Sequence, residues 1–123
     1  MLNTLLRPTM DHAVQQPISG AASALYPNHL STLMQRTEEA LRRVGKRHLL
    51  IPSGVTKYQF LDDRPYPFQV NPHFKAWLPL TEHADCWLVI TPGQKPHLIY
   101  LLADDFWHLP PQAPEGYWVA HWQ

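Results

Sequence analysis

The segment CWLVITPGQKPHLIYLL, residues 86–102, decides the fold of this chain. It holds two apolar runs, residues 86–90 and 98–102, on either side of a loop, residues 91–96, in which prolines flank a glycine. Short apolar runs bounded by turn-forming residues are typical of β-strands. A loop of this length joins antiparallel neighbours. We therefore predict an antiparallel hairpin at residues 86–102.

An amphipathic helix and another strand precede this hairpin. After Pro27, apolar positions recur at three- and four-residue steps, and charged residues fill the opposite face. The positions of the predicted core face are Leu30, Leu33, Met34, Thr37, Leu41 and Val44. Gly45 suits the left-handed conformation that follows a helix end. The run HLLIP, residues 48–52, predicts a strand buried on both faces behind the helix, and the class is therefore α/β.

The remaining segments predict little regular structure. Residues 1–23 show neither helical nor strand periodicity and are interpreted as a flexible tail. Residues 55–80 are rich in aromatic residues and proline, and they leave room for one strand candidate at residues 75–78. Residues 117–122 resemble the approach to a further strand. Most aromatic side chains in this half should be core, and a minority should face a partner.

Composition narrows the classes of function. The chain has 123 residues, the size of one domain, and its ten Lys and Arg balance ten Asp and Glu. No basic field is available for nucleic acid, and no apolar run reaches the length of a membrane span or a signal-peptide core. Cys86 is the only cysteine, which excludes an internal disulfide and favours a reducing compartment, the cytoplasm.

Two constellations could carry chemistry. His73, His83 and Cys86 could bind a zinc ion, but their spacing is not a recurrent ligand pattern and no fourth ligand is apparent. Surface histidines and a buried core thiol are the favoured interpretation. The aspartate pairs at residues 62–63 and 104–105 could serve acid–base chemistry, but adjacent residues of an extended chain point in opposite directions, so neither pair forms a site unaided.

A family resemblance runs from Leu25 and Tyr26 to Trp118, about three-quarters of the chain, and it assigns residues 24–123 to one domain. The segments that carry it are ALYPNHLSTLMQRTEEAL at residues 24–41, FLDDRPYPFQVNPHFKAWLPL at residues 60–80, CWLVI at residues 86–90, KPHLIYLLADDFWH at residues 95–108 and YW at residues 117–118. Together they resemble the amino-terminal domain of bacterial Xaa-Pro dipeptidases (prolidases) and of the similar organophosphorus acid anhydrolases, within the creatinase/prolidase amino-terminal domain family.

The resemblance implies a non-catalytic α/β domain with a mixed sheet and flanking helices. Here that domain would stop before its last strand and helix. The parent enzyme would be a homodimer that hydrolyses dipeptides ending in proline, with two divalent cations, manganese preferred, in a separate catalytic domain of the pita-bread type. That catalytic domain and its metal ligands are absent from these 123 residues, so the chain alone should hydrolyse nothing.

The resemblance assigns roles to two residues. Asp63 matches an aspartate that reaches into the substrate pocket of the neighbouring protomer, and Trp107 matches a tryptophan on a loop that covers the active site. The local patterns alone leave simpler interpretations open: Asp63 as a turn residue and Trp107 as core.

Two other hypotheses remain. The first is a stand-alone dimerisation or interaction module that retains the dimer surface and has lost the catalytic domain. An incomplete sheet would also expose an unpaired edge and apolar surface, which favours self-association. The second is a small zinc protein that uses His73, His83 and Cys86.

Overall fold

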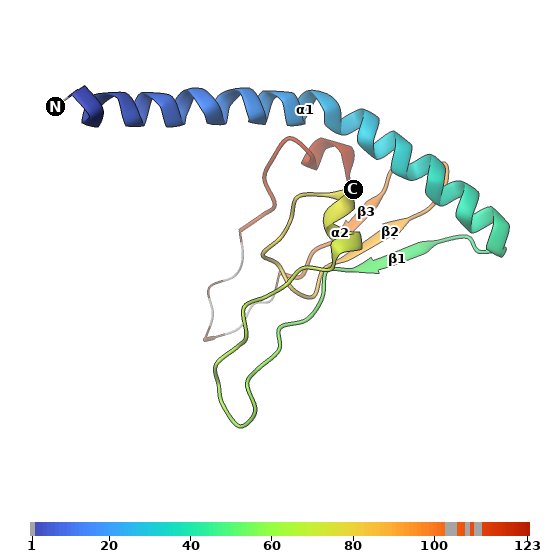
Figure 1. The fold of residues 1–123 in the computed structure, drawn as a ribbon. Coiled ribbons are helices and arrows are strands. Elements are labelled where there is room, and N and C mark those ends of the chain that lie inside the picture. The colour runs from blue at the N-terminus through green and yellow to red at the C-terminus, as the bar shows by residue number, and fades with distance from the viewer. Residues whose placement is uncertain (1, 103–105, 108, 110–111) are drawn as a thin grey trace.

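The computed structural model describes residues 2–102, 106–107, 109 and 112–123, and for residues 2–19 it describes the backbone alone. The elements, in chain order, are α1 (Leu2–Val44), β1 (Leu49–Pro52), α2 (Pro72–Trp77), β2 (Trp87–Ile90), β3 (His97–Ile99) and a 3₁₀ turn, η1 (Val119–His121). Figure 1 shows the long helix α1 lying across the sheet, and loops that extend from the sheet away from α1.

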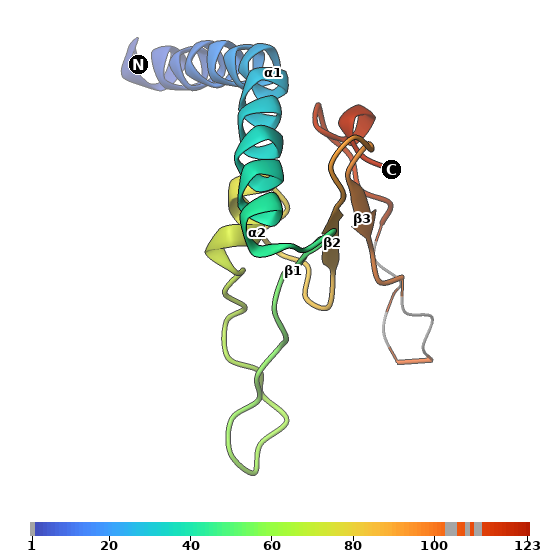
Figure 2. The same cartoon turned by 90° about the vertical axis from the view of Figure 1, so that its right-hand side faces the viewer.

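The three strands form one antiparallel sheet in the order β1-β2-β3. Leu50 pairs with Val89, and Leu88 pairs with Leu98. The predicted hairpin is confirmed, although β3 ends at Ile99, three residues before the predicted end at Leu102. Because β1 and β3 are both antiparallel to β2, they run parallel to each other, and the segments that follow them leave the sheet at the same end (Figure 2).

One face of the sheet forms the core. Ile51, Leu88 and Ile90 are buried and pack with side chains of α1 and α2. On the other face, Leu50 is 58% exposed and Ile99 is 55% exposed. The prediction that residues 48–52 are buried on both faces is therefore wrong for the described structure. Side chains alternate across a strand, and the core that includes both helices covers one of the two sides.

Helix α1 begins much earlier than predicted. A start after Pro27 is wrong, since the helix continues unbroken through that residue. Proline removes one backbone donor from a helix, but Tyr26 is anchored in the core, and this packing holds the turn on either side of Pro27. Residues 2–23, predicted to be irregular, are helical along their backbone. Their assignment to a flexible tail, separate from residues 24–123, stays a prediction.

The carboxyl end of α1 follows the predicted pattern. Gly45 has a φ of 65°, and Lys46 donates its backbone N–H to the carbonyl of Leu41 at 3.0 Å. Leu41 is buried, as its place on the apolar face predicts, whereas Val44, the last residue of the helix, is 66% exposed.

Helix α2 stands where a strand was expected. The strand candidate at residues 75–78 is wrong, because Asn71 accepts the backbone N–H of His73 in its side-chain oxygen and Pro72 occupies the first helical turn. Both features favour helix initiation. The short helix buries Phe74 and Trp77 in the core.

The last residues return to the sheet. Gln123 donates its N–H to the carbonyl of Pro96 at 2.9 Å and accepts the N–H of Leu98 at 2.8 Å. This pair of bonds is the pattern of two parallel strands. Trp118 and Trp122, just before it, are buried in the same core cluster.

Candidate functional site

Asp63 lies at the tip of a hairpin loop that follows β1. Two backbone bonds close the stem: Tyr66 N–H to the carbonyl of Lys57 at 2.7 Å, and Gln59 N–H to the carbonyl of Arg64 at 2.9 Å. In Figures 1 and 2 this loop, coloured green to yellow-green, projects beyond the end of the sheet. The stem therefore holds the tip away from the core.

The two aspartates of the tip are placed differently. Asp62 uses Oδ1 to accept the backbone N–H of Arg64 at 3.2 Å, as in an Asx turn. Asp63 is exposed, with its carboxylate in solvent. The turn role that the local pattern left open for Asp63 thus belongs to Asp62, and Asp63 is the carboxylate free to meet a ligand or a partner.

The tip also exposes apolar side chains. Phe60 is 89% exposed and Leu61 is 91% exposed. Leu61 has a φ of 56°, a left-handed conformation that costs energy for a residue with a branched side chain.

Trp107 lies after β3, and its side chain is 83% exposed. Its ring packs edge-on against Phe106, with centroids 5.0 Å apart. The interpretation of Trp107 as core is wrong. The segments that carry Asp63 and Trp107 follow β1 and β3, so they leave the sheet at the same end. The aspartates at residues 104–105 lie outside the described residues.

The base of the hairpin loop is closed by a residue that sequence reasoning missed. Asn71 donates its side-chain Nδ2–H to the carbonyl of Pro52 at 3.0 Å and its backbone N–H to the carbonyl of Ser53 at 2.8 Å. An Asn directly before a proline, at the start of a helix, is the signal that could have identified a capping residue here.

The three candidate zinc ligands do not form a site. His73 is exposed, while Cys86 is 1% exposed. The imidazole of His83 packs on Tyr100, with centroids 5.1 Å apart. The part of the chain that the structure describes holds no group of three His, Cys, Asp or Glu side chains able to bind a metal ion. Burial raises the pKa of the Cys86 thiol, in keeping with its predicted place in the core.

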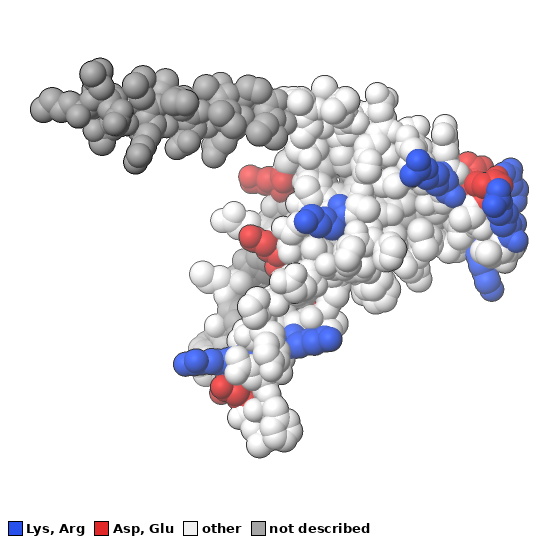
Figure 3. Space-filling model, in the orientation of Figure 1, with Lys and Arg blue, Asp and Glu red and all other residues white. Residues whose placement is uncertain are grey.

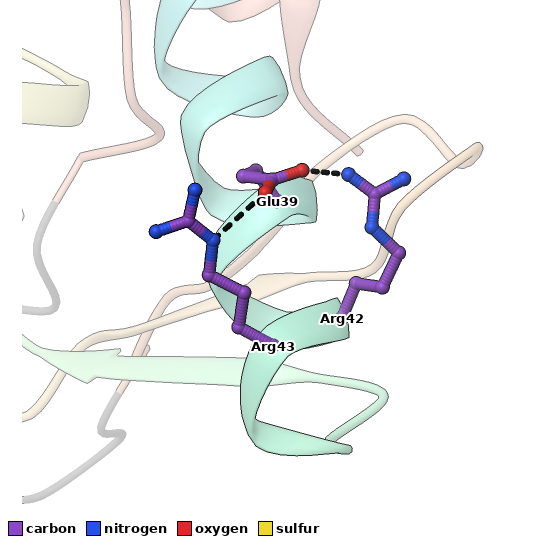
Figure 4. A network of polar contacts seen from close by, with 3 residues as sticks. All are labelled: Glu39, Arg42 and Arg43. Carbon is purple, nitrogen blue, oxygen red and sulfur yellow. Dashed lines mark hydrogen bonds and ion pairs between the residues drawn. The ribbon is translucent and has the colours of Figure 1, made fainter.

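Charged groups form small local networks. Glu39 contacts Arg42 and Arg43 near the carboxyl end of α1 (Figure 4). The positive charges of the two arginines also interact favourably with the helix dipole at this end. The side chains of Arg42 and Arg43 are largely exposed and that of Glu39 is 42% exposed, so these pairs contribute little to stability. Figure 3 shows acidic and basic groups interspersed on the face it draws. Within the described residues, we find no helix with the length and apolar character needed to span a bilayer.

These features define a class of protein. It is a small α/β domain that presents side chains from two loops at one end of its sheet and that, within the described residues, assembles no metal-binding cluster. Residues 24–123 match the family described as the amino-terminal domain of Xaa-Pro dipeptidase, and the chain belongs to that family.

Relatives with known names agree with this assignment. The chain is 56% identical over 99 residues to the Xaa-Pro dipeptidase of Xanthomonas axonopodis pv. citri, and 53% identical over 98 residues to that of Stenotrophomonas maltophilia. Each match covers 80% of this chain and 22% of the relative. The chain thus spans about a fifth of the length of these relatives.

Proposed function

We propose that this chain serves as the amino-terminal, non-catalytic domain of a homodimeric Xaa-Pro dipeptidase, and that its hairpin loop carries Asp63 to the substrate pocket of the neighbouring protomer. The observation that supports this proposal most directly is the place of Asp63. Asp63 is exposed at a tip that two backbone hydrogen bonds hold beyond the sheet, and the turn at this tip uses the carboxylate of its neighbour Asp62. The family match supplies the enzyme to which such a domain belongs.

The chemistry of the tip suits this role. An aspartate carboxylate is negative near neutral pH and accepts strong hydrogen bonds from a cation such as the amino end of a dipeptide. Trp107, exposed at the same end of the sheet, offers a broad apolar surface for covering a bound substrate. The hydrolytic step itself would rest on two divalent cations, manganese preferred, in the catalytic domain of the parent, which we place in the cytoplasm.

The finer architecture belongs to the same proposal. A mixed sheet is supported by Gln123, whose two hydrogen bonds to the β3 edge have the parallel pattern. A strand in that register would lie beside β3 and extend the antiparallel trio into a mixed sheet.

Hydrolysis assays on two proteins test the proposal. The isolated chain, supplied with manganese, is expected not to cleave a Xaa-Pro dipeptide. A hybrid is expected to cleave it, when residues 24–123 of this chain replace the matching segment of the Xanthomonas axonopodis enzyme. Cleavage by the isolated chain, or a folded hybrid without activity, would contradict the proposal.

A substitution in that hybrid tests Asp63 itself. We expect Asp63→Asn to raise KM roughly tenfold or more, because the amide loses the charge that strengthens the hydrogen bond. Asp62→Asn is the matched control, since its side-chain oxygen can still accept the N–H of Arg64, and it should leave KM almost unchanged. Equal effects from the two substitutions would remove the special role of Asp63.

One observation favours a second candidate, a stand-alone dimerisation module. Leu50, Trp87 and Ile99 expose apolar surface on the outer face of the sheet, with Trp87 43% exposed. Such a face can pair two copies. Sedimentation of the isolated chain tests this candidate: a specific dimer favours the module, whereas a monomer or open-ended aggregates argue against it.

A further inference from the structure

The hairpin loop that carries Asp63 is tied together at its base by Asn71. The loop leaves the sheet after Ser53 and returns to α2 at Asn71. The Nδ2–H of Asn71 donates to the carbonyl of Pro52 at 3.0 Å, and its backbone N–H donates to the carbonyl of Ser53 at 2.8 Å. Asn71 therefore spans the loop entrance with two hydrogen bonds.

Ser53, which accepts one of these bonds, is fixed to the sheet. It is fully buried, its N–H donates to the carbonyl of Cys86 at 2.8 Å, and its Oγ accepts the N–H of Cys86 at 3.0 Å. Cys86 directly precedes β2. The two carbonyls that accept hydrogen bonds from Asn71 thus belong to the last residue of β1 and to the residue directly after it. The base of the loop is therefore fixed relative to the sheet.

Among the described residues, we find no second side-chain hydrogen bond that joins the two ends of the loop. Next to the entrance, Gly54 has a φ of 120°, and the ring of Phe68 lies so close that a Cβ built on Gly54 would be 3.4 Å from it. The carbonyl of Gly54 also accepts the backbone N–H of Asp85 at 2.8 Å, a bond that fixes the outgoing side of the loop but does not involve its return at Asn71. Beyond Gly54, the next hydrogen bonds along the loop are those of the stem at Lys57 and Tyr66, which set the width of the hairpin but not its angle to the sheet.

We propose that Asn71 is a positioning residue, whose Nδ2–H bond to Pro52 fixes the direction in which the hairpin presents Asp63. This inference rests on the proposed function, because the bond matters for activity only if Asp63 acts in the neighbouring protomer. Asn71 also caps α2 through Oδ1, which accepts the N–H of His73 at 3.1 Å. One side chain thus joins the start of α2 to the end of β1 across the loop entrance.

The two uses of Asn71 can be separated by substitution. Asn71→Asp keeps an oxygen for the N–H of His73 but replaces the donor that faces the carbonyl of Pro52. Asn71→Ser keeps a capping oxygen on a side chain too short to reach Pro52, and it serves if the aspartate variant does not fold. Asn28→Asp makes the same chemical change at an exposed position of α1 and is the matched control.

Two measurements follow. In the isolated chain, trypsin cleavage after Lys57, quantified by mass spectrometry, should become about five- to tenfold faster in Asn71→Asp, the effect of losing one hydrogen bond on loop opening. In the hybrid enzyme, Asn71→Asp should raise KM at least about threefold with little change in kcat, as expected when a binding group is misplaced and the chemical step is intact. The control should change neither.

The outcomes distinguish the two proposals. If Asp63→Asn raises KM but the Asn71 variants change neither KM nor the cleavage rate, the positioning role is wrong while the proposed function stands. If Asp63→Asn leaves KM unchanged, the proposed function fails, and the delivery role of Asn71 fails with it. Faster cleavage after Lys57 would then show Asn71 as a structural tie alone.

Discussion

Trp122 donates its indole N–H to the hydroxyl of Tyr26 at 2.7 Å, joining residues 96 positions apart in the chain. The same hydroxyl donates to the backbone carbonyl of Trp77 at 2.8 Å. One phenol oxygen thus connects α1, the end of α2 and the last turn of the chain. All three side chains are buried.

Removing that oxygen should destabilise the fold. Tyr26→Phe leaves the N–H of Trp122 and the carbonyl of Trp77 without a partner in a buried setting, at a cost of about 1–3 kcal/mol in the free energy of unfolding. Urea denaturation followed by tryptophan fluorescence measures this. Tyr58→Phe, at a side chain 62% exposed, is the control and should change little. Equal stability of the two variants would show that the buried bonds contribute nothing.

The stability of the chain should fall in strong alkali. Burial raises the pKa of Tyr26 from 10.0 to about 12. The unfolded chain then loses this proton at a lower pH than the folded chain, so the contribution of Tyr26 is complete below about pH 10 and is lost as the pH rises towards about 12. Denaturation across that interval should show a shallower decline for Tyr26→Phe than for the unaltered chain. Parallel declines would contradict the assignment.

The thiol of Cys86 should be protected in the native state. It is 1% exposed, and burial raises its pKa, so little reactive thiolate is available. We expect a disulfide reagent to react slowly with the folded chain and rapidly in urea. Because Cys86 is the only cysteine, the signal has one source. Rapid reaction without denaturant would mean that the region next to β2 opens readily.

Two phenylalanines offer a matched test of the core. Phe74 is 0% exposed and Phe60 is 89% exposed. Phe74→Ala should lower the free energy of unfolding by about 3–5 kcal/mol, whereas Phe60→Ala should change it by less than about 0.5 kcal/mol. Denaturation midpoints of the two variants supply the comparison. A large loss of stability from Phe60→Ala would imply that the hairpin tip packs against the core.

Local patterns predicted the elements whose causes are local. Residues 86–102 carry apolar runs and turn residues side by side, and Gly45 marks a helix end by its conformational freedom; both predictions are confirmed. The passage of α1 through Pro27 was missed because its cause is distant: Tyr26 is held by Trp77 and Trp122. Packing of this kind overrides helix-breaking propensity.

The candidate site, too, could be predicted from the sequence only in part. Asp63 was chosen by resemblance, and nothing local distinguishes it from Asp62 until the hydrogen bond to Arg64 shows which of the two closes the turn. An Asn before Pro72 is typical of a helix start, but this pattern was not used because residues 75–78 were interpreted as a strand. The bond of Asn71 to Pro52 joins segments 19 positions apart and has no sequence signature.

The strand directions also divide the molecule into two ends for protein engineering. The connections after β1 and β3 occupy one end, so the β2–β3 turn at Gly93 and Gln94 and the link from α1 to β1 at Gly45 lie at the other. Gln94 is exposed. A fluorophore attached through Gln94→Cys, in a chain with Cys86→Ala, would therefore report on rotation and assembly from a position remote from Asp63, and surface immobilisation through the same residue would leave the hairpin tip facing solution.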